Sequence, residues 1–339
     1  MLTRSIIVLF VAFVTAWLAT KALIPLLLNR GLMDVPNGRS SHHVPTPRGG
    51  GLGIIAGIMA GLFTGWLLEI PLLNWQLLVG AGIIALVGFV DDQIGGLPAS
   101  VRFAVQFVAA GIVVYGNGGL NSLPLPEPLN ISLGFLAIPI ALLWLLAVTN
   151  IYNFLDGIDG FATVQGAIGG LAIAFLGDGL FISIGLAIAG ACIGFALHNW
   201  HPAKVFMGDV GSGTLGFLLA ALPFQLAPGS RSTAILATVI CLWFFLSDGV
   251  FTIARRLLNG ERVWTPHRSH LYQRLVRTGL RHDQVVLKVI GGALILTALA
   301  TLSARSGGAS AWWLVIVVAV LSFLIYCRWT WEREKGHAP

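Results

Sequence analysis

The sequence predicts an all-α protein that crosses a membrane many times, and two observations carry this prediction. Hydrophobic residues make up 56% of the 339 residues and charged residues only 10%, with a mean hydropathy of +0.86, whereas roughly a quarter of a soluble domain is charged. The apolar residues also gather into runs as long as a membrane-spanning helix requires. A soluble globular domain and a disordered chain are therefore excluded. The three cysteines lie inside apolar runs without redox spacing, which excludes a disulfide scaffold.

Eleven apolar runs predict eleven transmembrane helices in one domain that covers residues 1–339. The first run continues through Lys21 to Leu28 without a clear cleavage site, so we expect an uncleaved span rather than a signal peptide. Because the number is odd, the two termini are expected on opposite sides of the membrane. The predicted spans cover about 5–28, 50–68, 76–90, 99–115, 132–149, 160–177, 180–198, 213–227, 232–253, 285–303 and 312–329.

The charged residues predict an orientation. Most Lys and Arg residues fall in the loops that follow odd-numbered spans or at the C-terminal end, and cytoplasmic loops are rich in such residues. We therefore expect a periplasmic N-terminus and a cytoplasmic C-terminus. Most carboxylates share these loops, and because a carboxylate beside lipid is unfavourable, they indicate a water-filled cytoplasmic site. The loops cover about 29–49, 91–98, 150–159, 199–212 and 254–284.

The second predicted span carries a stripe of glycines on one face. Gly53, Gly57, Gly61 and Gly65 recur every four residues, which lets another helix approach closely. We expect tight packing within the chain, with a homodimer face as the alternative.

The first loop ends in a glycine-rich segment, Pro45 to Gly51, that includes Arg48. Backbone N–H groups of glycines at a helix start can bind an anionic oxygen, and an arginine adds positive charge. A flexible basic loop without a ligand is the alternative.

Two adjacent carboxylates, Asp91 and Asp92, close the third predicted span. They repel each other, and the dipole at the C-terminal end of a helix disfavours negative charge. A divalent metal or a role as proton acceptor explains the pair better than a solvated helix end does.

Asn150, Asn153, Asp156 and Asp159 follow at steps of three residues. This spacing places them on one helical surface. Two amides and two carboxylates suit coordination of a hard ion such as Mg²⁺; a purely structural polar cap is the alternative.

Asp209 lies between glycines just before the eighth predicted span. Metal or phosphate binding at a helix start is consistent with this position, and a plain glycine turn is the alternative. The surrounding spacing does not match the phosphate loop of nucleotide-binding proteins.

The longest loop combines guanidinium groups with imidazoles. It holds Arg255, Arg256, His267, Arg268 and His270, side chains that suit a diphosphate. Ordinary cytoplasmic positive charge is one alternative. A zinc site from the two histidines is another, which the lack of a cysteine in these loops disfavours.

Taken in order, these segments resemble the polyprenyl-phosphate N-acetylhexosamine-1-phosphate transferases. That family includes MraY of peptidoglycan synthesis, the WecA-type initiators of surface polysaccharides and the eukaryotic dolichyl-phosphate GlcNAc-1-phosphate transferase. The resemblance extends from about residue 30 to residue 280 and rests on residues 45–51, 91–92, 150–160 and 206–212 and on Asp248, Arg255, Arg256, His267 and His270.

The resemblance implies roles for individual residues. Asp209, with Asn153, would bind Mg²⁺, with Mn²⁺ as the alternative ion. The implied catalytic residues are Asp91, Asp92, Asp156, Asp159, His267 and His270. The implied substrate-binding residues are Thr46, Arg48, Gly49, Gly50, Asn150, Lys204, Asp248, Arg255, Arg256 and Arg268.

Two departures separate this chain from other branches. Gly95 stands where other branches carry a charge, and the histidine loop reads His-Arg-Ser-His from residue 267, instead of the three-histidine run of MraY or the His-x-His-His of WecA. This loop is similar to that of the WbpL-like branch, which initiates O-antigen synthesis.

The resemblance thus implies a reaction in a bacterial inner membrane. A UDP-N-acetylaminosugar would donate its sugar 1-phosphate to undecaprenyl phosphate, with release of UMP. The sugar could be N-acetylglucosamine, N-acetylfucosamine or N-acetylquinovosamine. No nucleic-acid partner is expected. A transporter of an anionic solute is the alternative function, although transporters usually place polar sites near the bilayer midplane.

Overall fold

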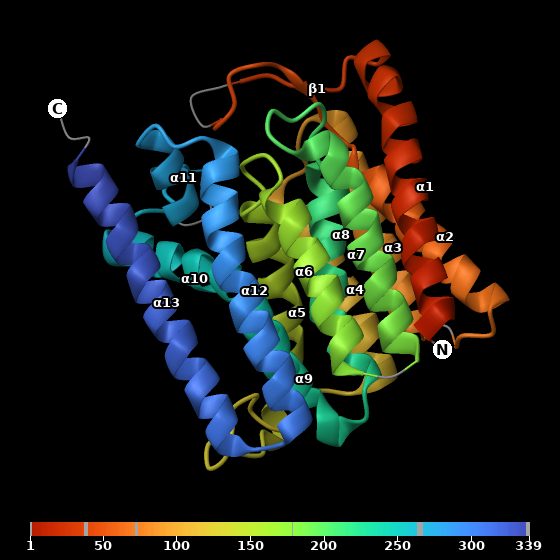
Figure 1. Cartoon of the computed structure of the whole chain (residues 1–339), viewed down its shortest axis with the longest axis vertical. Coiled ribbons are helices and arrows are strands. Elements are labelled where there is room, and N and C mark those ends of the chain that lie inside the picture. The colour runs from red at the N-terminus through yellow and green to blue at the C-terminus, as the bar shows by residue number, and fades with distance from the viewer. Residues whose placement is uncertain (1, 37–39, 72–73, 178, 263–266, 337–339) are drawn as a thin grey trace.

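The computed structural model describes residues 2–36, 40–71, 74–177, 179–262 and 267–336. Within these ranges the chain is almost entirely helical, and most helices run side by side (Figure 1). The helices are α1 (Leu2–Asn29), α2 (Gly51–Leu67), α3 (Trp75–Ile94), α4 (Ala99–Asn117), α5 (Ala137–Phe154), α6 (Phe161–Leu176), α7 (Leu180–Asn199), α8 (Gly208–Ala221), α9 (Pro228–Cys241), α10 (Trp243–Leu258), α11 (Leu271–Arg277), α12 (His282–Ser306) and α13 (Ala309–Lys335). Short 3-10 helices cover Gly134–Leu136 and Leu222–Gln225, and β1 (Met33–Asp34) pairs antiparallel with β2 (Thr46–Pro47).

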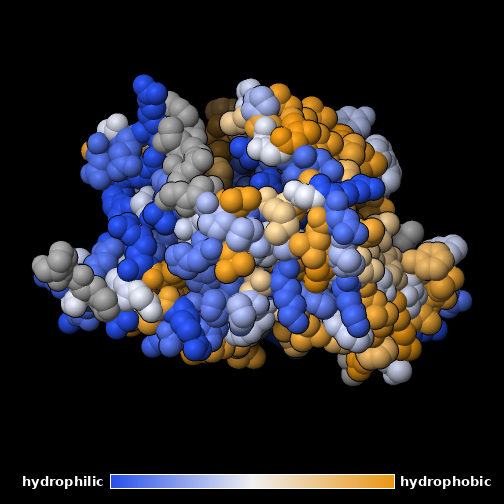
Figure 2. Space-filling model, turned by 90° about the horizontal axis from the view of Figure 1, so that it is seen from above, coloured by the Kyte–Doolittle hydropathy of each residue, from blue (hydrophilic) through white to orange (hydrophobic). Residues whose placement is uncertain are grey.

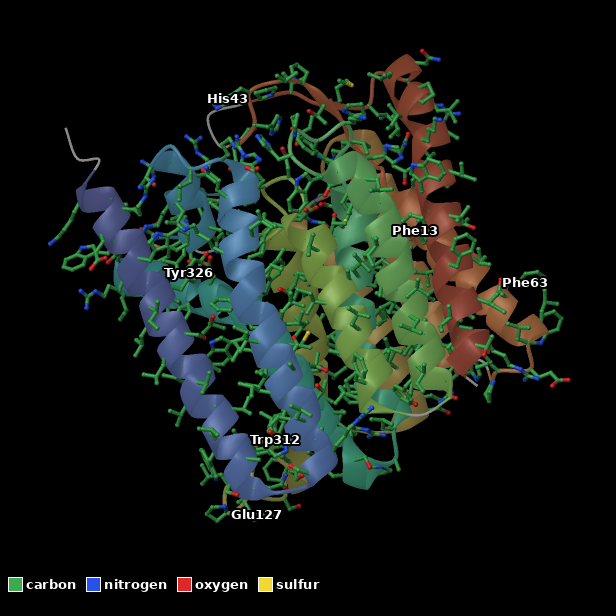
Figure 3. All side chains as sticks on the ribbon, in the orientation of Figure 1. Phe13, His43, Phe63, Glu127, Trp312 and Tyr326 are labelled. Carbon is green, nitrogen blue, oxygen red and sulfur yellow. The ribbon has the colours of Figure 1, made fainter. Side chains whose placement is uncertain are left out.

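The helix lengths confirm an all-α, multi-pass membrane protein. Among the described residues, 7 helices are long and apolar enough to span a membrane, or up to 8 if α9 and α10 form one bent span. The shorter apolar helices α2 and α6 have 17 and 16 residues. Large apolar side chains such as Phe63, 59% exposed, point outward from the bundle (Figure 3), as expected for a surface in contact with lipid. The direction of each crossing remains a prediction from the charges.

The ninth predicted span, 232–253, is wrong as a continuous helix. The chain breaks at Leu242, and α9 and α10 meet at 78°. Figure 1 shows α10 running across its neighbours instead of along them. The reason is its composition: α10 buries Asp248 and Arg256 on one face and exposes Val250 on another. Such a helix keeps its charged groups inside the protein, away from lipid.

The glycine stripe of α2 packs within the chain, as expected. α2 contacts both α1 and α7. A Cβ atom added at Gly57 would lie 2.7 Å from the carbonyl oxygen of Ala12, 2.8 Å from Ala16 Cβ and 2.9 Å from Ala191 Cβ. This face is therefore filled by the chain's own helices and is not available to a second copy.

We expect Gly57→Leu to destabilise the protein by about 1–3 kcal/mol, the usual range for overpacking. The added side chain would push α2 away from α1 and α7. Gly82→Leu on α3 is the control, because a Cβ there meets nothing within 4 Å. Thermal unfolding of the detergent-solubilised variants measures the difference; equal melting temperatures would contradict the packing argument.

Close backbone contacts fix the start of α8. The N–H groups of Gly50 and Gly51 donate to the carbonyl oxygens of Phe206 and Met207, at 2.9 and 2.8 Å. A Cβ at Gly88 of α3 would lie 2.6 Å from the carbonyl oxygen of Asp209, so only glycine permits this approach. The first loop and α3 thus hold the start of α8 at the end of the bundle where hydrophilic side chains gather (Figure 2).

Candidate active site

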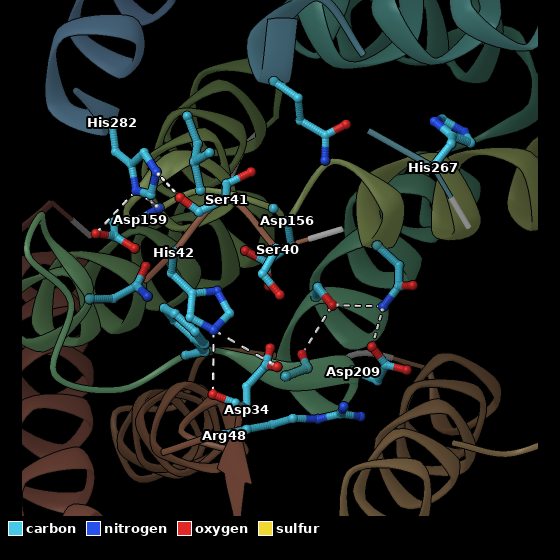
Figure 4. A pocket seen from close by; sticks show the side chains of 18 residues that line it. Asp34, Ser40, Ser41, His42, Arg48, Asp156, Asp159, Asp209, His267 and His282 are labelled. Atoms are coloured by element: carbon cyan, nitrogen blue, oxygen red, sulfur yellow. Dashed lines mark hydrogen bonds and ion pairs between the residues drawn. The ribbon is translucent and has the colours of Figure 1, made fainter. Parts of the chain in front are cut away.

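A cavity of about 420 Å³ opens at this end of the bundle (Figure 4). Side chains from the first loop, from the end of α5 and from the start of α8 face it. Of the residues implied by the family resemblance, six line this first cavity: Arg48, Asn153, Asp156, Asp159, Asp209 and His267. Segments far apart in the sequence therefore meet around one space.

A second cavity of about 350 Å³ lies beside the first. Its walls are largely apolar and include Ile84, Phe103 and Phe154, while its polar lining includes Asp91, Arg102, Gln106 and Asn150. Asn153 and Asp209 line both cavities. These two residues therefore form a shared wall between a polar space and a more apolar one.

Asp209 is held in the first turn of α8 by contacts with several side chains. Its Oδ1 accepts a hydrogen bond from Asn153 Nδ2 at 3.1 Å, and its Oδ2 lies 3.4 Å from Arg102 Nη1. Asn153 Nδ2 also donates to Ser212 Oγ at 2.8 Å. Carboxylate, amide and hydroxyl oxygens suit Mg²⁺ or Mn²⁺, so this group of side chains fits a hard divalent cation.

Asp92 caps the start of α8. Its Oδ1 and Oδ2 accept hydrogen bonds from the backbone N–H groups of Asp209 and Val210, at 2.9 and 3.1 Å. Arg48 Nε donates to the same Oδ1 at 2.8 Å. A carboxylate satisfies the free N–H groups of a helix start and complements its dipole. Asp92 lines neither of the two cavities, and its contacts hold the start of α8, with Asp209, in place.

Asp91 has a different environment from its neighbour. Its Oδ1 accepts the backbone N–H of Leu97 at 2.5 Å, and Oδ2 lies 3.5 Å from Arg48 Nη2. Asp91 lines the second cavity. Consecutive helical residues point about 100° apart, which explains how two adjacent carboxylates reach different surroundings.

Asp156 and Asp159 differ in the same way. Burial, together with the charges of Asp209, Asp92 and Asp159, raises the pKa of Asp156 to about 7. Burial also opposes ionisation of Asp159, but hydrogen bonds from His282 and His201 outweigh it and lower the pKa. Asp156 is therefore the carboxyl group of this loop that can exchange a proton near neutral pH.

The histidine loop is organised by a buried carboxylate. Asp248, 1% exposed, accepts hydrogen bonds from His270 Nδ1 at 3.1 Å and from the N–H groups of Leu271 and Tyr272 at 3.0 and 3.3 Å. Asp248 and His270 line none of the cavities described here. His267 does face the first cavity, and burial with the nearby His270 and Arg256 lowers its pKa to about 4.

The three arginines of this loop hydrogen-bond to other groups of the protein. Arg255 Nη2 donates to Ser269 O at 2.9 Å, Arg256 Nε to Glu261 Oε2 at 2.8 Å, and Arg268 Nη1 to Ser40 O at 3.0 Å. None of the three lines a cavity described here. In this arrangement their hydrogen bonds stabilise the loop.

The remaining predicted substrate-binding residues differ in whether they line a cavity. Thr46 lines a third cavity, which lies beside the first, whereas Lys204 lines none of the three. The backbone N–H of Gly50 is already bound to Phe206, and Gly49 supplies a positive φ of 100° next to Arg48. Arg48, not the glycine N–H groups, is therefore what this segment offers to an anion.

Sequence reasoning missed three residues that contact the site. Arg102 joins Asp91 and Asp209, and His201 and His282 both reach Asp159. His201 shares the predicted loop 199–212 with Asp209, and His282 lies in the predicted loop 254–284, so position in the predicted loops was an available signal for both. Arg102 gave a weaker signal, because it lies just inside the predicted span 99–115.

Known proteins match this chain along most of its length. Residues 74–227 match the family described as Glycosyl transferase family 4. The chain is 32% identical over 316 residues to a probable undecaprenyl-phosphate N-acetylglucosaminyl 1-phosphate transferase of Bacillus subtilis, covering 90% of this chain and 88% of the relative.

Further relatives come from other bacteria. The chain is 31% identical to a decaprenyl-phosphate N-acetylglucosaminephosphotransferase of Mycobacterium leprae, covering 82% of this chain and 78% of the relative. It is 29% identical to an undecaprenyl-phosphate alpha-N-acetylglucosaminyl 1-phosphate transferase of Escherichia coli O157:H7, covering 87% and 83%. The chain therefore belongs to glycosyl transferase family 4 and is an enzyme of the polyprenyl-phosphate N-acetylhexosamine-1-phosphate transferase group.

Proposed function

We propose that this enzyme transfers an N-acetylaminosugar 1-phosphate from a UDP-sugar to undecaprenyl phosphate, releasing UMP. The observation that carries the proposal is the meeting of a polar and a largely apolar cavity at Asp209 and Asn153. A nucleotide sugar suits the first cavity, and a lipid phosphate with its isoprenoid chain suits the second. The two reacting phosphates would then meet at the shared wall.

Asp209 and Asn153 would hold Mg²⁺ or Mn²⁺. When bound, the ion would neutralise the negative charge of the diphosphate and of the leaving UMP. Stabilising this charge is the main requirement of phosphoryl transfer. Two arginines add positive charge near this ion site. Arg102 Nη1 lies 3.4 Å from Asp209 Oδ2, and Arg48 Nε lies 2.8 Å from Asp92 Oδ1. Both guanidinium groups can bind phosphate oxygens in a defined orientation.

The two adjacent carboxylates would have separate roles. Asp91 lines the second cavity, so it is the one that can face the acceptor phosphate and take up a proton from it. Asp92 would act through α8, by fixing the position of Asp209. We therefore assign the contact with the acceptor to Asp91 and the positioning of Asp209 to Asp92.

The first cavity would receive the nucleotide sugar. Asp156, with its pKa of about 7, and His267 face this space and can hydrogen-bond to the donor. Asp159 would position the loop, since its carboxylate is bound to His201 and His282. Asp248 and His270 would keep the histidine loop in place at the rim.

We further propose that the active site faces the cytoplasm at a bacterial inner membrane. The enzyme would catalyse the first step in the synthesis of an O-antigen or a similar surface polysaccharide. The excess of Lys and Arg in the predicted cytoplasmic loops supports this orientation. The His-Arg-Ser-His sequence from residue 267 supports the assignment to the O-antigen-initiating branch. N-acetylglucosamine, which the names of the quoted relatives carry, is the first sugar to test; N-acetylfucosamine and N-acetylquinovosamine follow.

The test is a transfer assay with the full-length protein in membranes. Radiolabelled UDP-N-acetyl sugars and undecaprenyl phosphate are incubated with and without Mg²⁺, and the organic phase is analysed for labelled lipid. We expect an Mg²⁺-dependent lipid-linked product with one of the three sugars. No product with any of them would contradict the proposed function.

Arg102→Ala is expected to raise the KM for undecaprenyl phosphate about 10- to 100-fold, the loss typical of a hydrogen bond to a charged group. Arg102 lines the second cavity, so its removal should affect the acceptor more than the UDP-sugar. Initial rates with each substrate varied in turn measure both constants. Arg277→Ala, on exposed α11 surface, is the control; a rise confined to the UDP-sugar KM would contradict the assignment of the second cavity.

A further inference from the structure

One carboxylate and two imidazoles form a cluster beside the first cavity. His201 Nδ1 lies 2.6 Å and His282 Nδ1 3.2 Å from Asp159 Oδ2, and the three candidate ligand atoms all lie within 4.8 Å of one another. The residues come from the loop after α5, the segment before α8 and the start of α12. Asp159 and His282 also line the third cavity, of about 400 Å³, together with His201.

Hydrogen bonds indicate which nitrogen of His282 carries its proton. Nε2 lies 3.1 Å from the carbonyl oxygen of Ser41 (Figure 4). A carbonyl oxygen only accepts, so Nε2 must donate, and in the neutral ring Nδ1 then presents a lone pair. This lone pair accepts the N–H of Asp159 at 3.3 Å and also faces Asp159 Oδ2. Either a second proton on the ring, which would let Nδ1 donate to Asp159, or a metal ion in its place would supply the positive charge that Nδ1 and Oδ2 require at this distance.

The surroundings of the cluster are those of an oriented metal site. Histidines that bind metals usually donate their other ring N–H to a carbonyl or carboxylate, which fixes the ring; Ser41 accepts such a bond from His282. Asp159 Oδ2 is in turn bound by the N–H of Ala203 at 3.2 Å. Asp159 and His282 are only 6% exposed. We propose that Asp159, His201 and His282 bind a divalent transition-metal ion of the zinc class.

The ligand types separate this site from the one around Asp209. Two imidazole nitrogens and one carboxylate favour zinc or a similar ion, whereas oxygen ligands alone favour Mg²⁺. Three protein ligands leave a fourth position for water or for a group in the adjoining cavities. Binding would displace the proton that His201 Nδ1 shares with Asp159, so metal uptake should release protons. The bound ion would join three segments that lie far apart in the sequence.

Metal analysis of the full-length enzyme tests this proposal. The protein is purified in detergent without a histidine tag, stripped with a chelator and dialysed against Zn²⁺ or Co²⁺ in excess Mg²⁺. We expect about one transition-metal ion per chain, and for Co²⁺ the visible absorption of a low-coordinate site.

Matched variants locate the ion. His201→Gln and His282→Gln should weaken Zn²⁺ affinity at least about 100-fold, because even loss of a residue that only orients a ligand costs 10- to 100-fold. His43→Gln is the control, since His43 lines the third cavity outside the cluster. It should bind as the wild type does.

Two results would overturn the proposal. One is a wild-type protein that takes up no Zn²⁺ or Co²⁺, which would leave a protonated His282 to hold the cluster. The other is equal binding by wild type and both glutamine variants. Metal uptake by the wild-type protein can be measured whether or not the variants fold. It also does not depend on the outcome of the transferase assay.

Discussion

Asp209→Asn is expected to lower the transferase rate about 100- to 1,000-fold, a loss comparable to removing one preorganised electrostatic group from an active site. The substitution keeps the size of the side chain and its contact with Asn153, but it removes the negative charge that would bind Mg²⁺. The protein should still insert and fold, because Asp209 lies at the shared wall of two cavities, not in the packed core.

Labelled lipid product per mole of purified variant measures the effect. Glu332→Gln removes a carboxylate from exposed α13 and should leave the rate unchanged. Size-exclusion chromatography of both variants checks folding. An Asp209→Asn enzyme with normal turnover would remove the basis for the metal assignment.

Asp92→Asn is expected to reduce both activity and thermal stability. Asp92 accepts two backbone N–H groups of α8 and the Arg48 guanidinium. An amide has one acceptor oxygen and would present its NH₂ group to another donor, so at least one buried donor loses its partner. Such a loss costs about 1–3 kcal/mol, and the start of α8 would shift with Asp209 on it.

Asp91→Asn is the matched comparison on the neighbouring residue. Its remaining oxygen can still accept the N–H of Leu97, so the melting temperature should fall less than in Asp92→Asn. Its activity should fall because Asp91 lines the second cavity, which we propose receives the acceptor phosphate. If the two variants lose stability equally, the separate roles of the pair are not supported.

Much of the architecture could be predicted from hydrophobic runs, because a bilayer admits only helices and closed barrels and these runs have the length of a spanning helix. Six of the residues predicted from the loops line one cavity: Arg48, Asn153, Asp156, Asp159, Asp209 and His267. Each lies at or near the end of a helix on the same side of the bundle, so a correct sequence of spans brings them to one end.

What could not be predicted depends on contacts between distant segments. The apolar run through Leu242 gave no sign of a 78° bend, which arises because Asp248 and Arg256 must stay inside the protein. Nor could the sequence distinguish Asp91 from Asp92, since their roles depend on which helices each carboxylate faces. The pairing of His282 with Asp159 spans 123 residues and appears only once α12 packs beside the loop after α5.

The wall shared by the two cavities bears on the design of ligands. If the two cavities take the donor and the acceptor as we propose, a molecule that joins a uridine group to a long isoprenoid-like tail through a phosphate mimic would occupy both at once. Linking two binding groups makes the second association intramolecular, and a linker that matches the span can strengthen binding by about 10²- to 10⁴-fold over either half. Asn153 and Asp209 mark the point that such a linker has to cross.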